Sequence, residues 1–276
     1  MRAPQAGVIK VLGGNLRACL ARTRVTRTAT PFVPPSHPPT LAPAAPPAPE
    51  HWARQLMQRG RYLMLLKLAG VTAFMWVFFT AYFHILRNPV RPVFEMPLTP
   101  LDHAVVPQPW AFAAYVSLWI YVGIVPGMML RVRETLLYGA WAAALCITGL
   151  AIFYLAPTAV PPPHITADLS QHAGFALLNG VDASGNACPS LHVATALFSA
   201  VWVAALLRHV GAPPWLRMAN WVWLLLIVYS TLAIKQHVAL DALAGAALGG
   251  AFAWASTRWW VPAPWLPTRW LPRGAR

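Results

Sequence analysis

Charged residues are scarce in this chain, and the scarcity limits its class. Only 10% of the 276 residues are charged, whereas 58% are hydrophobic. Soluble domains carry about 25% charged residues, so this composition is typical of a membrane protein. Cysteine is also rare, and Cys19, Cys146 and Cys188 lack the spacing of a zinc or redox motif. The sequence therefore predicts a membrane protein without a cysteine-based metal site.

Acidic residues are fewer than basic ones, 7 against 21, which gives a formal net charge of +14. An excess of this size can indicate nucleic-acid binding when the basic residues form one patch. Here they separate long apolar runs instead, as they do in the loops of membrane proteins. We therefore expect a membrane as partner, and no nucleic acid.

Apolar runs of spanning length dominate the sequence after about residue 60. Most reach the ~20 residues that a helix needs to cross the hydrocarbon core. They are too long for membrane strands and do not alternate cleanly. The runs cover about residues 62–86, 108–130, 136–157, 191–208, 215–234 and 238–260. The predicted fold class is all-α, a six-helix transmembrane bundle with a disordered N-terminal tail.

The segments outside the bundle are basic and rich in proline. Residues 1–56 contain an Ala/Pro tract that favours disorder or polyproline conformation, and 261–276 form a short basic tail. No apolar core of a secretory signal precedes the tract. The Arg-rich start resembles a transit peptide, and an over-extended start upstream of Met57 is the other interpretation. The six-span domain is expected over 57–260.

The basic residues also predict an orientation. The segments before, between and after the six runs alternate between several basic residues and few. The loop 158–190, for example, has no Lys or Arg. Cytoplasmic loops carry the excess of Lys and Arg. We therefore expect both termini in the cytoplasm and the polar motifs on the outer face of the membrane. A bacterial inner membrane is the expected location.

The first informative motif is Pro189-Ser190-Leu191-His192, where a polar loop meets the fourth run. The free N–H groups of a helix start, together with its dipole, attract anions. Ser190 adds a hydroxyl donor beside them. The alternative is that Ser190 only caps the helix and His192 is an interfacial residue.

The second motif places His237 four residues before Asp241, at the start of the sixth run. That spacing puts both side chains on one helix face, where the carboxylate can hold one ring N–H of the imidazole. The other nitrogen is then available as a nucleophile or base. A shared metal ion and an interfacial histidine beside an unrelated acid are the alternatives. A carboxylate at membrane depth is costly, which favours a functional interpretation.

In this order, Pro-Ser-x-His followed by Ser-x6-His-x3-Asp, the two motifs resemble the type 2 phosphatidic acid phosphatase superfamily. The second runs from Ser230 to Asp241. Leu191 in place of glycine and Thr231 in place of arginine are closer to the inositol phosphorylceramide synthase branch and its bacterial relatives. The stretch 96–102 before Pro109-Trp110 is also similar to that branch. The resemblance covers about residues 60–255.

The resemblance implies a role for each motif residue. His237 would attack phosphorus to form a phosphohistidine, Asp241 would orient it, and His192 would protonate the leaving oxygen. Ser190 would hold phosphate oxygens, and no metal or other cofactor would be required.

The sequence departs from the family at two phosphate-binding positions. His84 stands where the first motif has lysine, before Arg91-Pro92, and Thr231 replaces an arginine. Arg91 and Lys235 are therefore the predicted phosphate-binding cations, with snorkelling side chains as the alternative. His84, Asp102, Asn186 and Thr231 are the other candidates for lining the site.

These observations predict a membrane lipid phosphatase or phosphotransferase acting on a lipid phosphate or a phosphodiester headgroup. Fewer basic residues at the phosphate leave hydrolysis and headgroup transfer both open. The alternatives are a non-catalytic scaffold and a small transporter. A transporter more often shows internal repeats and helices broken at mid-membrane. The sequence does not predict an oligomeric state.

Overall fold

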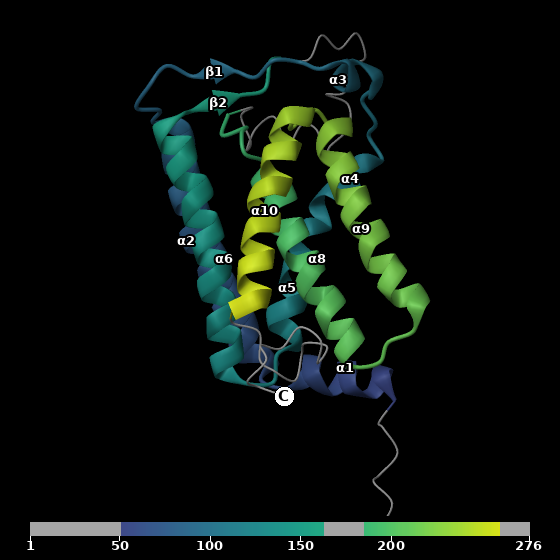
Figure 1. Ribbon diagram of the computed structural model, residues 1–276. Helices are drawn as coiled ribbons and strands as arrows, with labels where there is room; N and C mark the ends of the chain where they lie inside the picture. The colour runs from purple at the N-terminus through teal and green to yellow at the C-terminus, as the bar shows by residue number, and fades with distance from the viewer. Residues whose placement is uncertain (1–50, 163–184, 260–276) are drawn as a thin grey trace, which may run out of the picture. The chain divides into compact units, whose positions relative to one another are not determined.

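The described residues form six helical segments of spanning length, as the sequence predicts. The computed structural model describes residues 51–162 and 185–259, all within the compact unit Pro49–Arg276. The predicted tail over residues 1–50, most of the loop 158–190 and the C-terminal tail therefore lie outside the described residues. The spanning helices are α2 (Met64–Arg87), α4 with α5 (Ala111–Val116 and Leu118–Met128), α6 (Val132–Leu155), α8 (Leu191–His209), α9 (Pro214–Ala233) and α10 (Ala239–Trp259) (Figure 1).

Helix α8 occupies the interior of the bundle. Protein buries 72% of its span, against 6% for α2. It packs against α5, α9 and α10. Two glycines of α10 permit the closest of these approaches: a Cβ at Gly245 or Gly249 would collide with the carbonyl of Ser190 or Ala194. These glycines are four residues apart, a small-xxx-small spacing that from the sequence alone predicts close helix packing, and the packing of α10 against α8 confirms it.

The second span is interrupted at Ser117, between α4 and α5. The Ser117 hydroxyl donates to the carbonyl of Ala114 at 2.6 Å and accepts from the indole N–H of Trp223 at 2.9 Å. A serine that hydrogen-bonds back to its own helix bends it. The interruption therefore ties the second span to α9 at mid-helix.

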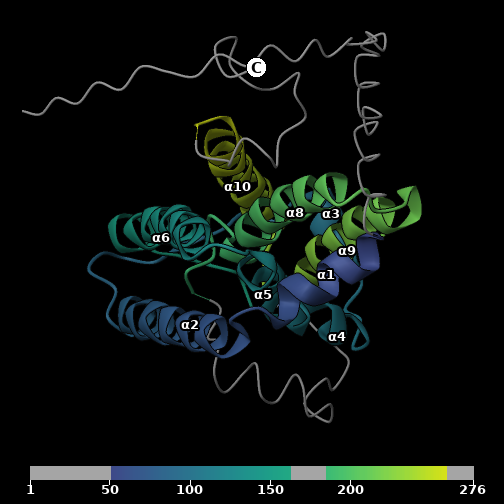
Figure 2. The ribbon, with the colours of Figure 1, turned by 90° about the horizontal axis from the view of Figure 1, so that it is seen from below.

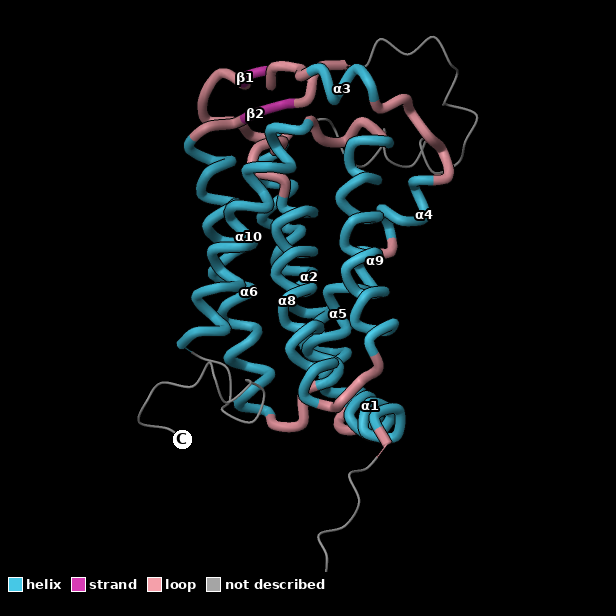
Figure 3. Tube along the Cα trace, turned by 45° about the vertical axis from the view of Figure 1, so that its right-hand side comes forward, coloured by secondary structure: helices cyan, strands magenta, loops and turns pink. Residues whose placement is uncertain are grey.

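The two ends of the bundle differ in structure. One end carries α3 (Pro100–Ala104) and two parallel two-residue strands, β1 (Phe94–Glu95) and β2 (Thr158–Ala159). The opposite end carries α1 (Trp52–Arg61), which lies across the bundle (Figures 1 and 3). Apolar side chains of α1 pack against the core, and such a helix suits the membrane interface. Helix α1 begins within the segment predicted as a disordered tail.

Candidate active site

Helix α8 begins at the first motif, and its buried start lies at the end of the bundle that carries α3. Ser190 is the N-cap, and its hydroxyl accepts from the N–H of Val193 at 3.3 Å. Its own N–H donates to the carbonyl of Asp241 at 3.0 Å. The capping role weighed from the sequence is therefore present. The N–H groups of Leu191 and His192 remain outside the helical ladder, an arrangement that can attract an anion.

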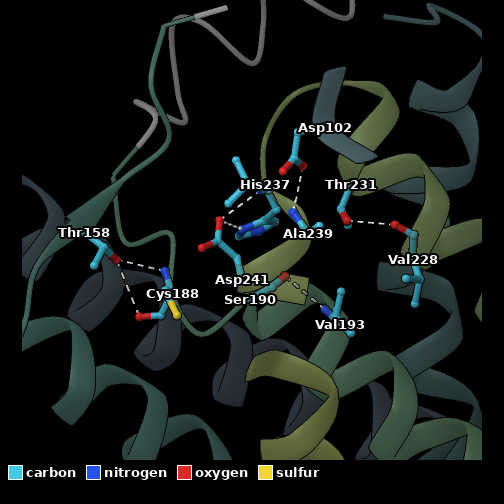
Figure 4. A network of polar contacts seen from close by, with 11 residues as sticks. Asp102, Thr158, Cys188, Ser190, Val193, Val228, Thr231, His237, Ala239 and Asp241 are labelled. Atoms are coloured by element: carbon cyan, nitrogen blue, oxygen red, sulfur yellow. Dashed lines mark hydrogen bonds and ion pairs between the residues drawn. The ribbon is translucent and has the colours of Figure 1, made fainter. Parts of the chain in front are cut away.

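His237 lies on the turn that joins α9 to α10, and the backbone of Thr231 fixes its position. The Thr231 carbonyl accepts from the N–H of Gln236 and that of His237, both at 3.1 Å. The Thr231 hydroxyl donates to the carbonyl of Val228 at 2.8 Å (Figure 4). Thr231 therefore shapes the turn that holds His237.

Asp241 lies one helical turn after His237 and is fully buried. Its Oδ2 accepts from the N–H of Val238 at 3.0 Å, which caps the start of α10. The same oxygen is 3.7 Å from Nδ1 of His237, a separation for an ion pair but longer than a hydrogen bond. Catalytic hydrogen bonds are often long before substrate binds. His237 and Asp241 therefore face each other as the i, i+4 spacing predicts, at a separation longer than a hydrogen bond.

The two motif histidines meet at this end of the bundle. Their ring centroids are 5.6 Å apart, with the planes inclined by 59°. Nε2 of His192, Nδ1 of His237 and Oδ1 of Asp241 are buried without a hydrogen-bond partner among the described residues. Buried polar atoms without partners are rare and call for an explanation. A phosphate oxygen could pair with Nε2 of His192, whereas Nδ1 of His237 faces the carboxylate of Asp241.

Two aromatic side chains hold His192, and the sequence analysis did not identify them. Tyr115 stacks on its ring at 4.4 Å between centroids, and Trp119 meets it edge to face at 5.7 Å. Both lie on the second span, among many other aromatic residues of apolar runs. No pattern in the sequence distinguishes them, because only the packing of the second span against α8 brings them to His192.

Asp102 and Lys235 lock α3 to the turn that carries His237. Oδ1 of Asp102 accepts from the N–H of Ala239 at 2.8 Å, and its Oδ2 accepts from the N–H and hydroxyl of Thr99. Nζ of Lys235 donates to the carbonyls of Asp102 at 2.8 Å and Val105 at 2.6 Å. Asp102 thus contacts the start of α10 beside the site. The ammonium group of Lys235 uses two of its N–H donors on backbone carbonyls. Phosphate binding by Lys235 stays a prediction.

Burial of Lys235 gives a pH-dependent stability. Desolvation lowers its pKa from 10.5, and the Asp102 charge opposes that change. The unfolded chain keeps this proton to higher pH than the folded one, so the free energy of unfolding rises with pH between the lowered pKa and 10.5. We expect Lys235→Met to lose this rise. Thermal unfolding in detergent from neutral pH to 10.5 tests this, and parallel curves for the two proteins would contradict it.

The remaining candidates lie at the same end but do not join the histidine pair. His84 is exposed near the end of α2, and Arg91 is exposed on the loop that follows. Asn186 is buried and donates to the carbonyl of Tyr82 at 3.3 Å, which fixes the approach to Ser190. In the described part of the chain, the structure therefore places neither His84 nor Arg91 in contact with His192 or His237.

Cys188 immediately precedes Pro189 and belongs to the same loop. Its N–H donates to the hydroxyl of Thr158 at 2.8 Å. Burial raises the pKa of its thiol, and the charge of Asp241 raises it further. A cysteine at this position could be a small loop residue or a reactive thiol. The thiol form is less nucleophilic than the thiolate, so this environment favours the small loop residue.

The described residues contain no group of three or more His, Cys, Asp or Glu side chains placed to hold a metal ion. His237 and Asp241 alone would supply two donors. The shared-metal interpretation would therefore need further ligands, such as water or a substrate oxygen.

Comparison with known families agrees with the two motifs. The sequence model of the PAP2 superfamily matches residues 134–265, slightly less than half of the chain. This segment contains Ser190, His192, His237 and Asp241, and it begins after His84 and Arg91. No curated protein and no solved structure matched the chain. Together with six apolar helices, the match indicates a membrane protein of phosphatase type.

Proposed function

We propose that the protein transfers the phosphoryl or phosphodiester group of a membrane lipid through a phosphohistidine at His237. The proximity of the two motif histidines carries the proposal: residues 45 positions apart in sequence place their rings 5.6 Å apart at one end of the bundle. The PAP2 superfamily match over this segment supports it. No metal is needed, because the histidines, the helix start and the acid supply the required groups.

The proposed reaction has two steps. Nε2 of His237 attacks phosphorus while Nδ1–H donates to Asp241, and the bond from phosphorus to the leaving oxygen breaks. Protonated His192 gives its proton to that oxygen. In the second step, neutral His192 takes the proton of water or an alcohol, whose oxygen attacks phosphorus and releases His237. The start of α8 holds the phosphate oxygens.

The acceptor decides between hydrolysis and headgroup transfer. Thr231 stands where the family has an arginine, and its hydroxyl is used within α9. Each missing cation removes more Coulomb attraction from a dianionic monoester than from a monoanionic diester. We therefore favour transfer of a phosphodiester headgroup, as in the inositol phosphorylceramide synthase branch.

We also propose that the site faces outward from a bacterial inner membrane, with both termini in the cytoplasm. The loops rich in arginine leave the bundle at the end that carries α1, whereas the histidines lie at the opposite end. The positive-inside rule then orients the bundle. Accessibility of single cysteines placed at the two ends would test this orientation.

Turnover in vesicles tests the proposed activity. Purified protein is incubated with labelled phosphatidic acid, or with a labelled phosphodiester lipid and an alcohol acceptor. We expect labelled phosphate or a labelled transfer product, formed at the same rate with and without a chelator. Loss of activity with the chelator and its return with added metal would favour the shared-metal interpretation. No turnover of either lipid class would favour a scaffold or transporter.

A further inference from the structure

A large apolar cavity lies beside the candidate site, between α2 and the helices α4, α5, α6 and α8. Its volume is about 1190 Å³, and aliphatic and aromatic side chains form almost all of its wall. Pockets for drug-sized ligands occupy about 300–1,000 Å³. Figure 2 looks along these helices and shows α2 apart from α8. The size and the lining fit a hydrocarbon chain.

The cavity extends along most of the membrane thickness. Leu66 and Phe83, both on α2, line it, and a rise of 1.5 Å per residue separates them by about 26 Å. The hydrocarbon core of a bilayer is about 30 Å thick, so one leaflet provides about half of that length. A chain that fills the cavity therefore passes the bilayer midplane.

Polar groups distinguish the two ends of the cavity. At one end His192 lines it, and the Nε2 of this ring is buried without a partner among the described residues. At the other end Nζ of Lys67 donates to the carbonyls of Arg59 and Gly127, at 2.9 and 2.8 Å. Arg131, also at that end, pairs with Glu134 at 3.9 Å. Of these three side chains, only His192 thus has a buried polar atom without a partner among the described residues, and that atom could receive a headgroup oxygen.

We infer that this cavity binds the hydrocarbon chain of the lipid whose phosphate lies between His192 and His237, and that it selects a chain reaching past the midplane. The inference rests on the proposed function. A chain that moves from bilayer to cavity exchanges one apolar medium for another, so hydrophobicity provides little selection. Shape and length select the chain instead.

Three glycines allow a matched test. Gly70 on α2 and Gly139 on α6 line the cavity, whereas Gly123 on α5 does not. A Cβ at any of the three meets no heavy atom within 4 Å. Gly70 lies about 20 Å along α2 from Phe83, in the half of the cavity far from His192. Gly70→Phe and Gly139→Phe therefore obstruct its deep half, and Gly123→Phe is the control.

The measurement is kcat/KM in phosphatidylcholine vesicles for isoprenyl phosphates of increasing length and for the corresponding isoprenyl phosphodiesters, the class that the proposed function favours. For chains that cross the midplane, we expect each deep variant to lower kcat/KM about tenfold, the effect of a steric conflict in a packed site. The chain of farnesyl phosphate ends before the obstruction, so its kcat/KM should change less than about twofold. The Gly123→Phe protein should follow the wild type at every length. Equal losses at all lengths, or no loss, would overturn the inference.

Photocrosslinking separates this inference from the proposed reaction. A long-chain isoprenyl phosphate with a terminal diazirine should label peptides around Gly70 in wild type and in His237→Ala, and lose that labelling in Gly70→Phe. Labelling without turnover in wild type would reject the reaction and keep the chain site. Turnover with labelling confined to other surfaces would keep the reaction and reject the chain site. Equal labelling by a diazirine phosphatidylcholine would show a structural lipid and overturn the inference.

Discussion

Replacing His237 by alanine abolishes turnover, and this is the largest effect that we expect. The variant removes the proposed nucleophile, so the rate should fall by about 10³-fold or more. Because the imidazole is buried 3.7 Å from the Asp241 carboxylate, thermal unfolding in detergent accompanies the assay and separates a loss of chemistry from a loss of folded protein. Release of phosphate and formation of the transfer product, measured in vesicles, check the result.

The control for this variant is His209→Ala. His209 is exposed on the last turn of α8, at the end of the bundle opposite His192. Its replacement should leave kcat and KM near the wild-type values. If His237→Ala retained wild-type turnover, His237 would not be the nucleophile.

Asp241→Asn should have the second-largest effect, because it changes the charge beside His237 without changing the shape. An amide oxygen can still accept the N–H of Val238, so the helix cap survives. The carboxylate that would orient His237 and stabilise its positive charge is lost. By analogy with the acid of a Ser-His-Asp triad, the rate should fall by about 10²- to 10⁴-fold.

Comparison with Asp241→Ala separates orientation from capping. The alanine variant also removes the cap, which should lower the free energy of unfolding by about 1 kcal/mol relative to asparagine. Glu95→Gln, an exposed acid on β1 at the same end of the bundle, is the neutral control for charge. Full activity in Asp241→Asn would limit Asp241 to its structural role at the start of α10.

The sequence was sufficient to predict the six spans because the thickness of the bilayer fixes the minimum length of an apolar run that crosses it. The predicted runs 191–208 and 215–234 differ from α8 and α9 by no more than one residue at either end. The spacing of Gly245 and Gly249 likewise predicted a close approach that the packing of α8 against α10 confirms. In these cases the constraint acts locally, on length and on small residues.

The parts that sequence reasoning missed depend on tertiary contacts. Helix α1 is too short and too polar for a span, and packing of its apolar face stabilises it. The stacking of Tyr115 on His192 and the lock between Asp102 and Ala239 join residues far apart in the chain. The order of the apolar runs and their basic loops predicted that His192 and His237 share one membrane face, but not which side chains would surround them.

The identity of the phosphorylated residue tests the central claim most directly. Wild-type protein in vesicles is mixed with labelled lipid phosphate, stopped under alkaline conditions that preserve phosphohistidine, and digested for mass spectrometry. The proposed mechanism predicts label on His237, absent from His237→Ala and discharged by water or an alcohol acceptor. Label on another residue, or turnover without any phosphorylated enzyme, would contradict it.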